Sequence, residues 1–210
     1  FKYYGDTVKT TNEHVPILIT KASNFNTACD TIDIVYGDMQ YDQSKTPKYT
    51  FQRYKVTYSC ERSKLPDKSA PPLPGNKFPP INAFAVYKTK VIWDETGNNW
   101  KNPRTDGNNA TYEKQLIADY IDDLVFLPID DEGKLIDPPP TVNNATKDKL
   151  YKIKTVDIAL SIRSTKKFYR SDKDRTKFTL NNPLRKKTRN DKYFRETIVV
   201  TAHARNMGTL

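Results

Sequence analysis

Apolar side chains recur at every second position over much of the chain, which is the pattern of β-strands. The clearest case is Thr155–Arg163, where four aliphatic residues from Val156 to Ile162 alternate with polar or small ones. The same alternation predicts further strands over residues 15–19, 31–36, 49–58, 83–93, 122–129 and 193–204. No heptad, solenoid period or long amphipathic helix occurs. The pattern therefore predicts an α+β fold, predominantly antiparallel β with long loops and little helix, in one globular domain over residues 1–210.

Several segments interrupt the alternation. Gly37 and Asp38 are expected to end the second strand, so that residues 38–48 connect it to the third. Residues 65–80 contain six of the 14 prolines and are predicted to form a surface loop. Residues 112–120 are predicted to form one or two helical turns, and residues 164–192 a long basic connection without regular periodicity.

Charge is distributed unevenly along the chain. The net charge is +10, but the last 64 residues contain 18 Lys and Arg against 6 Asp and Glu, and the first 146 contain 17 against 19. A basic face of this kind attracts nucleic acid, anionic polysaccharide, an acidic protein or phospholipid headgroups. The alternative is a solvated face with ordinary salt bridges.

Aromatic residues are interleaved with the basic ones in this region, as in proteins that bind phosphates and stack bases. No helix-turn-helix, RNP or KH pattern accompanies them, so the sequence favours non-specific contact with DNA or another polyanion. The candidate contact residues are Lys166, Lys167, Arg170, Arg185, Lys186, Lys187, Arg189, Lys192 and Arg195.

Cys29 and Cys60 are the only cysteines. They border two strands that are expected to pair, and this pairing would bring them to the same end of a hairpin. A disulfide is therefore predicted, which requires an oxidising and hence extracytoplasmic compartment. The alternative is two unrelated buried thiols.

Catalytic and cofactor motifs are not found. The seven glycines form neither a Walker loop nor a dinucleotide-binding fingerprint, and His14 and His203 have no nucleophile motif near them. The acidic runs 122–123 and 130–132 do not match a calcium loop and are expected to be solvated turns. We therefore predict a protein that is not an enzyme and that uses no cofactor and no metal. No window reaches the ~18 apolar residues of a membrane-spanning helix, and no signal peptide pattern is present.

Five segments follow one another in a recognisable order. They are Cys-Asp-Thr-Ile-Asp-Ile-Val-Tyr at 29–36, Tyr-Lys-Val-Thr-Tyr at 54–58, residues 115–126, residues 153–164, and residues 194–207 with their closing Arg-Asn. In order and spacing they resemble the motifs of the W-type minor pilins of type IV pili, and the similarity spans residues 29–207.

This resemblance implies a pilin-like headgroup sheet in a non-catalytic subunit that primes assembly or forms the tip of the pilus. Pilins carry an apolar N-terminal helix with Glu at position five, whereas Phe1 here is followed by a segment ending in Gly5 without such a helix. The chain is therefore expected to be a headgroup without its anchor helix. Its implied partners are other minor and major pilins, contacted through that helix and the sheet edges. The full-length form would be anchored in the inner membrane before assembly, and the headgroup would lie in the periplasm or at the cell surface.

Two other functions fit the same pattern. One is a secreted adhesive or carbohydrate-binding β-domain, with Trp93, Trp100 and the tyrosines as an exposed platform. The other is a minor pseudopilin of type II secretion, a close relative of the pilins.

Overall fold

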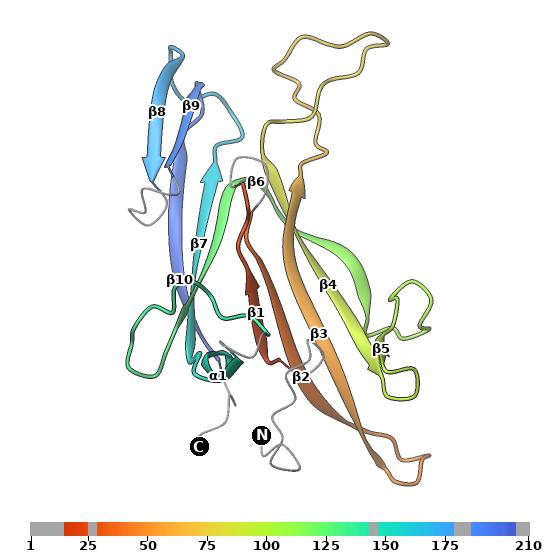
Figure 1. Cartoon of the computed structure of the whole chain (residues 1–210). Coiled ribbons are helices and arrows are strands. Elements are labelled where there is room, and N and C mark those ends of the chain that lie inside the picture. The colour runs from red at the N-terminus through yellow and green to blue at the C-terminus, as the bar shows by residue number, and fades with distance from the viewer. Residues whose placement is uncertain (1–14, 25–28, 143–146, 179–185, 205–210) are drawn as a thin grey trace.

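One antiparallel sheet dominates the structure (Figure 1). The computed structural model describes residues 15–24, 29–142, 147–178 and 186–204. The sheet contains β1 (Ile17–Thr20), β2 (Thr31–Tyr41), β3 (Tyr49–Arg62), β4 (Phe84–Asp94), β6 (Tyr112–Ile129), β7 (Thr155–Arg163) and β10 (Arg195–His203), in the order β1-β2-β3-β4-β6-β7-β10. The short β5 (Asn99–Trp100) pairs with β4, and β8 (Lys173–Phe178) pairs with β9 (Lys186–Asp191) in a separate hairpin.

The predicted predominance of antiparallel β structure is confirmed. Within the described residues the only helix is α1 (Lys147–Leu150), and no helix there is long and apolar enough to cross a membrane. Residues 63–83 contain only isolated bridges, in keeping with their prolines.

The predicted end of the second strand at Gly37 is wrong, because β2 continues to Tyr41. The missing side chain of Gly37 explains the continuation. A Cβ atom added there would lie 2.3 Å from the Phe51 ring, which occupies that space from the neighbouring strand β3. Glycine therefore serves here as a close-approach site within the strand.

The predicted helical turns over residues 112–120 are also wrong, because this segment is the first half of β6. Its pairing with β4 shifts register three times, and Lys114 and Tyr120 adopt positive φ angles of 48° and 61°. Each such irregularity moves the side-chain alternation out of phase. The strand consequently loses the two-residue period that would have identified it.

Residues 164–192 are not a simple connection either, since they contain the β8–β9 hairpin. Five of its six cross-strand pairs are polar, the exception being Phe178 opposite Lys186, and the hydroxyl oxygens of the pair Thr176 and Thr188 lie 2.8 Å apart. A hairpin without an apolar face shows no hydrophobic alternation, so the sequence pattern did not predict it.

Strand β6 changes partners halfway along its length. Residues up to Ile121 pair with β4, and residues from Ile121 onward pair with β7. The sheet is thereby divided into two halves that share β6, with β1 to β4 in one and β7 and β10 in the other (Figure 1). The second half of β6 has no strand on its other side among the described residues, so the backbone groups there need other partners.

Asp30, which is fully buried, supplies some of these partners. Its backbone N–H donates to the carbonyl of Leu124 (3.1 Å), and its carboxylate accepts from the N–H of Phe126 (3.3 Å). Lys21 donates both to this carboxylate (2.9 Å) and to the carbonyl of Phe126 (2.6 Å). The β1–β2 connection thus takes the place of a neighbouring strand and bends the first half of the sheet toward the second.

The predicted Cys29–Cys60 disulfide is present, with the two Cα atoms 5.6 Å apart. It fixes the residue before Asp30 to β3. The bond therefore secures the segment that bends the sheet.

We expect the double substitution Cys29→Ala/Cys60→Ala to lower the free energy of unfolding by about 3–4 kcal/mol, since it opens a loop spanning 31 residues of sequence separation. Urea denaturation measures the change, and reduced wild type is the control, which should show a similar loss. Unchanged stability in both proteins would contradict the expectation.

We expect Asp30→Asn to lower the free energy of unfolding by about 3 kcal/mol, because the fully buried carboxylate accepts hydrogen bonds from Lys21 and from the N–H of Phe126, and the amide cannot replace this charge-assisted set. Glu132→Gln is the matched control: its partner Lys134 and Glu132 itself are both largely exposed, so a change of at most about 1 kcal/mol is expected. Equal losses in the two variants, measured by urea denaturation, would show that Asp30 has no special role.

Candidate functional site

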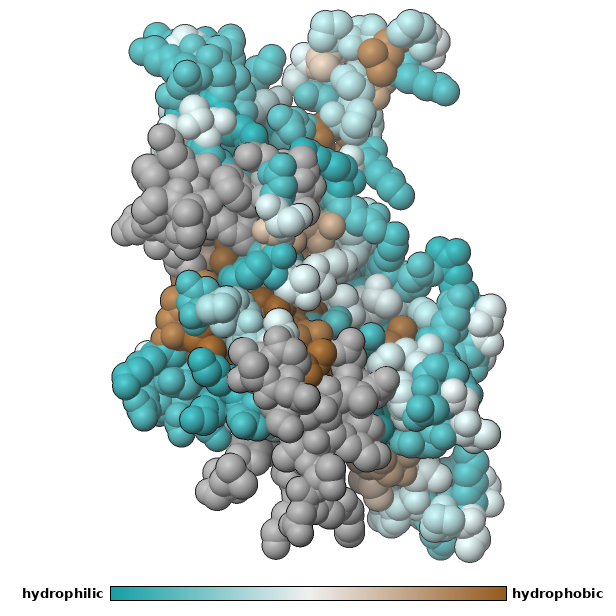
Figure 2. All heavy atoms as spheres, in the orientation of Figure 1, coloured by the Kyte–Doolittle hydropathy of each residue, from teal (hydrophilic) through white to brown (hydrophobic). Residues whose placement is uncertain are grey.

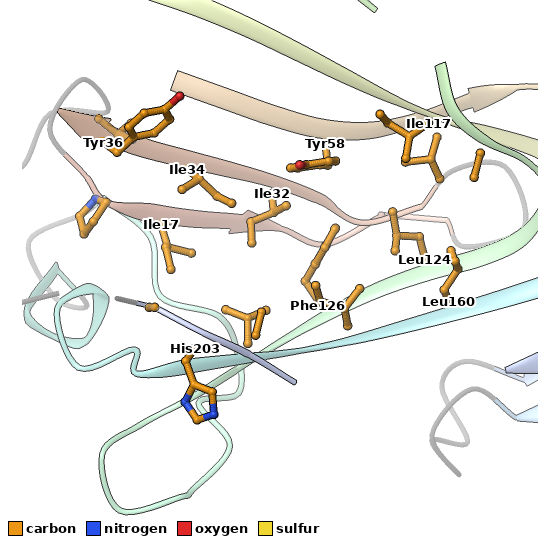
Figure 3. Close-up of a pocket in the computed structure, with 18 of the residues that line it drawn as sticks. Ile17, Ile32, Ile34, Tyr36, Tyr58, Ile117, Leu124, Phe126, Leu160 and His203 are labelled. Carbon is orange, nitrogen blue, oxygen red and sulfur yellow. The ribbon is translucent and has the colours of Figure 1, made fainter. Parts of the chain in front are cut away.

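An apolar groove lies between the two halves of the sheet (Figure 3). Its volume is about 720 Å³, and all seven strands of the main sheet contribute to its lining. Figure 2 shows hydrophobic residues gathered near the middle of the molecule, with hydrophilic residues along part of their border.

Alternation within the strands explains why the lining is aliphatic. Ile32 and Ile34 lie on one face of β2, and Ile158 and Leu160 lie on one face of β7. Because the two halves of the sheet are inclined toward each other at β6, the face of β2 and the face of β7 both border the groove (Figure 3). The groove is therefore a product of strand periodicity and of the change of partners along β6.

Burial varies across the groove. Ile32, Leu124 and Phe126 are buried at its floor, Leu160 is half-buried, and Ile117 at the rim is 50% exposed. The groove is thus open to solvent along part of its length and offers apolar surface to a ligand.

Polar groups are few in the lining. The side chains with polar atoms are Tyr36, Tyr58 and His203, and no carboxylate, lysine or arginine is among the lining residues. No group of three or more His, Cys, Asp or Glu side chains that would hold a metal ion occurs in the part of the chain that the structure describes. The arrangement is suited to binding an apolar body, and it contains no acid–base pair.

The candidate polyanion contacts fall into separate groups. Lys187 and Arg195 are buried, and they lie with the half-buried Arg189 beside Asp122 and Asp123 of β6. Lys187 Nζ donates to the carbonyl of Asp122 (2.6 Å) and lies 3.5 Å from the Asp123 carboxylate. Lys187 thus gives another backbone carbonyl of β6 a hydrogen-bond partner.

Arg195 makes a bidentate pair with Asp191, at 2.8 and 2.6 Å, and its Nε lies 3.4 Å from the Asp122 carboxylate. Arg189 lies 3.5 Å from the same carboxylate. Three of the candidate cations are therefore partnered by acidic groups within the molecule, and the acidic pair at 122–123 is buried instead of forming the predicted solvated turn.

Burial lowers the pKa of the Lys187 ammonium, although Asp123 and Asp122 act against this shift. Burial would by itself raise the pKa of Asp191, but hydrogen bonds from the Arg195 guanidinium and the backbone N–H of Tyr193 hold it below its ordinary value. The Asp191–Arg195 pair is therefore a stabilising contact of the β9–β10 corner.

The other candidates are distributed differently. Lys166, Lys167 and Arg170 are exposed, and the two lysines line a second cleft of about 720 Å³ against the Pro-rich loop. Lys192 lies 3.7 Å from the carboxylate of Asp172. Lys186 begins β9, and Arg185 lies outside the described residues. Contact with DNA or another polyanion stays a prediction that rests chiefly on Lys166, Lys167 and Arg170.

Trp93 does not form part of an exposed platform, because only 7% of its surface is accessible. Its ring packs edge-on against that of Trp100, with centroids 5.1 Å apart. This burial removes Trp93 from the platform on which the carbohydrate-binding alternative depended, whereas Tyr41 and Tyr49 are 56% and 59% exposed, so that alternative stays a prediction.

Sequence reasoning missed the groove and the counter-ions of the basic residues. A signal for the counter-ions was available, since Asp122 and Asp123 stand between the apolar residues Ile121 and Leu124. An acidic pair inside an apolar strand needs buried cations. The groove had no comparable signal, because it depends on the relative position of strands distant in sequence.

No protein-family model matches the chain, and no match was found among curated proteins or solved structures. The interpretation of the groove therefore rests on the structure itself.

We expect Asp191→Asn to lower the free energy of unfolding at pH 7 by about 2 kcal/mol, because Arg195 loses its bidentate carboxylate. The pKa of Asp191 is depressed below 3.8 in the folded state, so its contribution is present above that value and is lost as the pH falls through the folded pKa. Stability measured by urea denaturation should therefore converge between wild type and variant in acid. Asp172→Asn, at a 59% exposed side chain, should show little effect at any pH, and a pH-independent difference for Asp191→Asn would contradict the assignment.

Proposed function

We propose that the protein is a non-catalytic structural subunit of an extracytoplasmic assembly, of the kind represented by minor pilins, and that its groove receives an α-helix with an apolar face. The single observation that carries the proposal is the open aliphatic groove between the two halves of the sheet. The disulfide adds support for an oxidising compartment.

An apolar sheet face requires a second layer in a stable domain. In the described residues α1 has only four residues, and the β8–β9 hairpin contacts Asp122 and Asp123, which are not in the groove lining. The groove thus offers an apolar surface that another element could cover.

The shape of the groove favours a helix over a second sheet. Ile17 and Ile34 line it from one half of the sheet, and Ile158 and Leu160 line it from the other. A trough with walls on two sides accommodates a cylinder about 10 Å across more readily than a flat sheet. Since the lining contains no charged carboxylate, lysine or arginine, the inserted face should be uncharged.

The resemblance to minor pilins would make this helix part of the same polypeptide, preceding the headgroup. A minor pseudopilin of type II secretion would use the groove in the same way. Both interpretations give the chain a structural task and locate it in the periplasm or at the cell surface.

The test uses a synthetic helical peptide with one leucine-rich face, labelled with a fluorophore. Ile117 and Leu116 are adjacent on β6 and are 50% and 52% exposed, but only Ile117 lines the groove. We expect Ile117→Asp to weaken peptide binding at least about tenfold and Leu116→Asp to leave it unchanged, because a carboxylate in the groove loses solvation when the helix inserts.

Fluorescence anisotropy measures the affinity, and a peptide of the same composition with its leucines scattered around the helix is the second control. Absence of binding by wild type, or equal weakening by the two substitutions, would reject the groove as a helix-binding site. Binding of a free fatty acid in preference to the peptide would indicate a lipid site instead.

A further inference from the structure

Strand β10 ends the sheet, and nothing among the described residues pairs with its outer side. It has nine residues, whereas β1 at the opposite end has four. Short strands are one way in which proteins protect sheet edges, and β1 is protected in this way. Strand β10 is not.

The hydrogen bonds at its two ends determine which backbone groups point outward. The N–H of Ser164 donates to the carbonyl of Phe194, and the N–H of Ala204 donates to the carbonyl of Lys154, both at 2.8 Å. Backbone groups alternate in direction along a strand, so those of the even-numbered residues from 196 to 202 face β7. The N–H and C=O groups of Thr197, Val199 and Thr201 therefore face outward.

The side chains along this edge are apolar and uncharged. Ile198 and Val199 are each 48% exposed and Val200 is 56% exposed. Between Thr197 and Ala202 there is neither a charge nor a proline, although both are common protections of an exposed edge. A long edge with these properties is a template for an additional strand.

We propose that β10 pairs with β10 of a second copy of the protein, antiparallel and with the two-fold axis at Val199. This register places Val199 opposite Val199 and Thr197 opposite Thr201 of the second copy. The outward N–H and C=O groups of these three residues thereby face the outward N–H and C=O groups of the second copy, as an antiparallel ladder requires. A register displaced by one residue would set outward groups against inward ones.

The side chains are complementary in the same register. Ile198 lies opposite Val200 of the second copy, on the face that carries Ile158 and Leu160, so their exposed apolar surfaces cover each other. Glu196 lies opposite Ala202 of the second copy, so no like charges meet.

The threonine side chains are already ordered by the neighbouring strand. The hydroxyl of Thr197 lies 2.6 Å from that of Ser161, and the hydroxyl of Thr201 donates to Asp157 at 2.5 Å. Ordering a flexible strand lowers the affinity of an interface, but the contacts with β7 already order β10 before the second copy binds.

The edge is small beside a standard interface of about 1,600 Å², so the dimer is expected to be weak and concentration-dependent. This inference does not depend on the proposed function of the groove.

The first test compares wild type with Val199→Pro by sedimentation equilibrium. Proline at this position removes an outward N–H and leaves the hydrogen bonds to β7 intact, because Val199 makes none of them. We expect wild type to dimerise and Val199→Pro to raise the dissociation constant at least about tenfold. The control is Leu116→Lys, at a similarly exposed residue away from the edge, which should dimerise as wild type does. A monomeric wild type at the highest soluble concentration, or an unchanged dissociation constant in Val199→Pro, would overturn the proposal.

The second test reads out the register and does not require proline to be tolerated. With the axis at Val199, the cysteine of one Val199→Cys molecule lies opposite the same cysteine of the second molecule. Their Cα atoms are about 5.5 Å apart, a distance that a disulfide can span. The single variants Thr197→Cys and Thr201→Cys would each place the two cysteines about 14 Å apart, beyond that reach.

We therefore expect mild oxidation to link Val199→Cys into dimers, detected on a non-reducing gel, and to leave the other two variants monomeric. Linking of all three variants would indicate a parallel pairing, and linking of none would reject pairing at this edge. Either result contradicts the proposed arrangement.

Discussion

The structure depends on one backbone constraint, which is the change of partners along β6. Its first half pairs with β4 and its second half with β7, and residues 122–126 of the second half, which have no second neighbouring strand in the part of the chain that the structure describes, are buried. Buried carbonyl and N–H groups need hydrogen bonds, because losing those made to water without replacement costs several kcal/mol. Asp30 and Lys21 supply them at Leu124 and Phe126, and Lys187 supplies one at Asp122. Charged side chains thus substitute for a strand.

The shape of the molecule follows from these contacts. Asp30 holds the β1–β2 connection against β6, and the disulfide to Cys60 secures that connection to β3. The two halves of the sheet are thereby inclined toward each other, and their apolar faces line the groove. The same arrangement leaves β10 without a strand on its outer side among the described residues, so both the groove proposed to receive a helix and the edge proposed to pair with a second copy derive from it.

Ion pairs within the molecule reduce the number of basic C-terminal residues that are available to bind a polyanion. A net charge of +10 is compatible with a polyanion-binding face, but several of its cations are used internally. Lys187 and Arg195 contact carboxylates of Asp122, Asp123 and Asp191 within the fold. Among the exposed candidates, Lys166 and Lys167 line the cleft beside the Pro-rich loop, and neither is among the residues that line the groove.

Local alternation was sufficient to predict the strand Thr155–Arg163, most of the strand Tyr49–Arg62 (predicted over residues 49–58) and the pairing that joins Cys29 to Cys60. The reason is that a half-buried strand must repeat its apolar side chains every second residue. It failed for residues 112–120, where irregular pairing with β4 shifts that period, and for the β8–β9 hairpin, which has no continuous apolar face. The groove, the burial of Lys187 and the free edge at β10 were decided only by tertiary structure. Each depends on which distant segments lie beside β6 and β7, and a period along one strand carries no information about its neighbours.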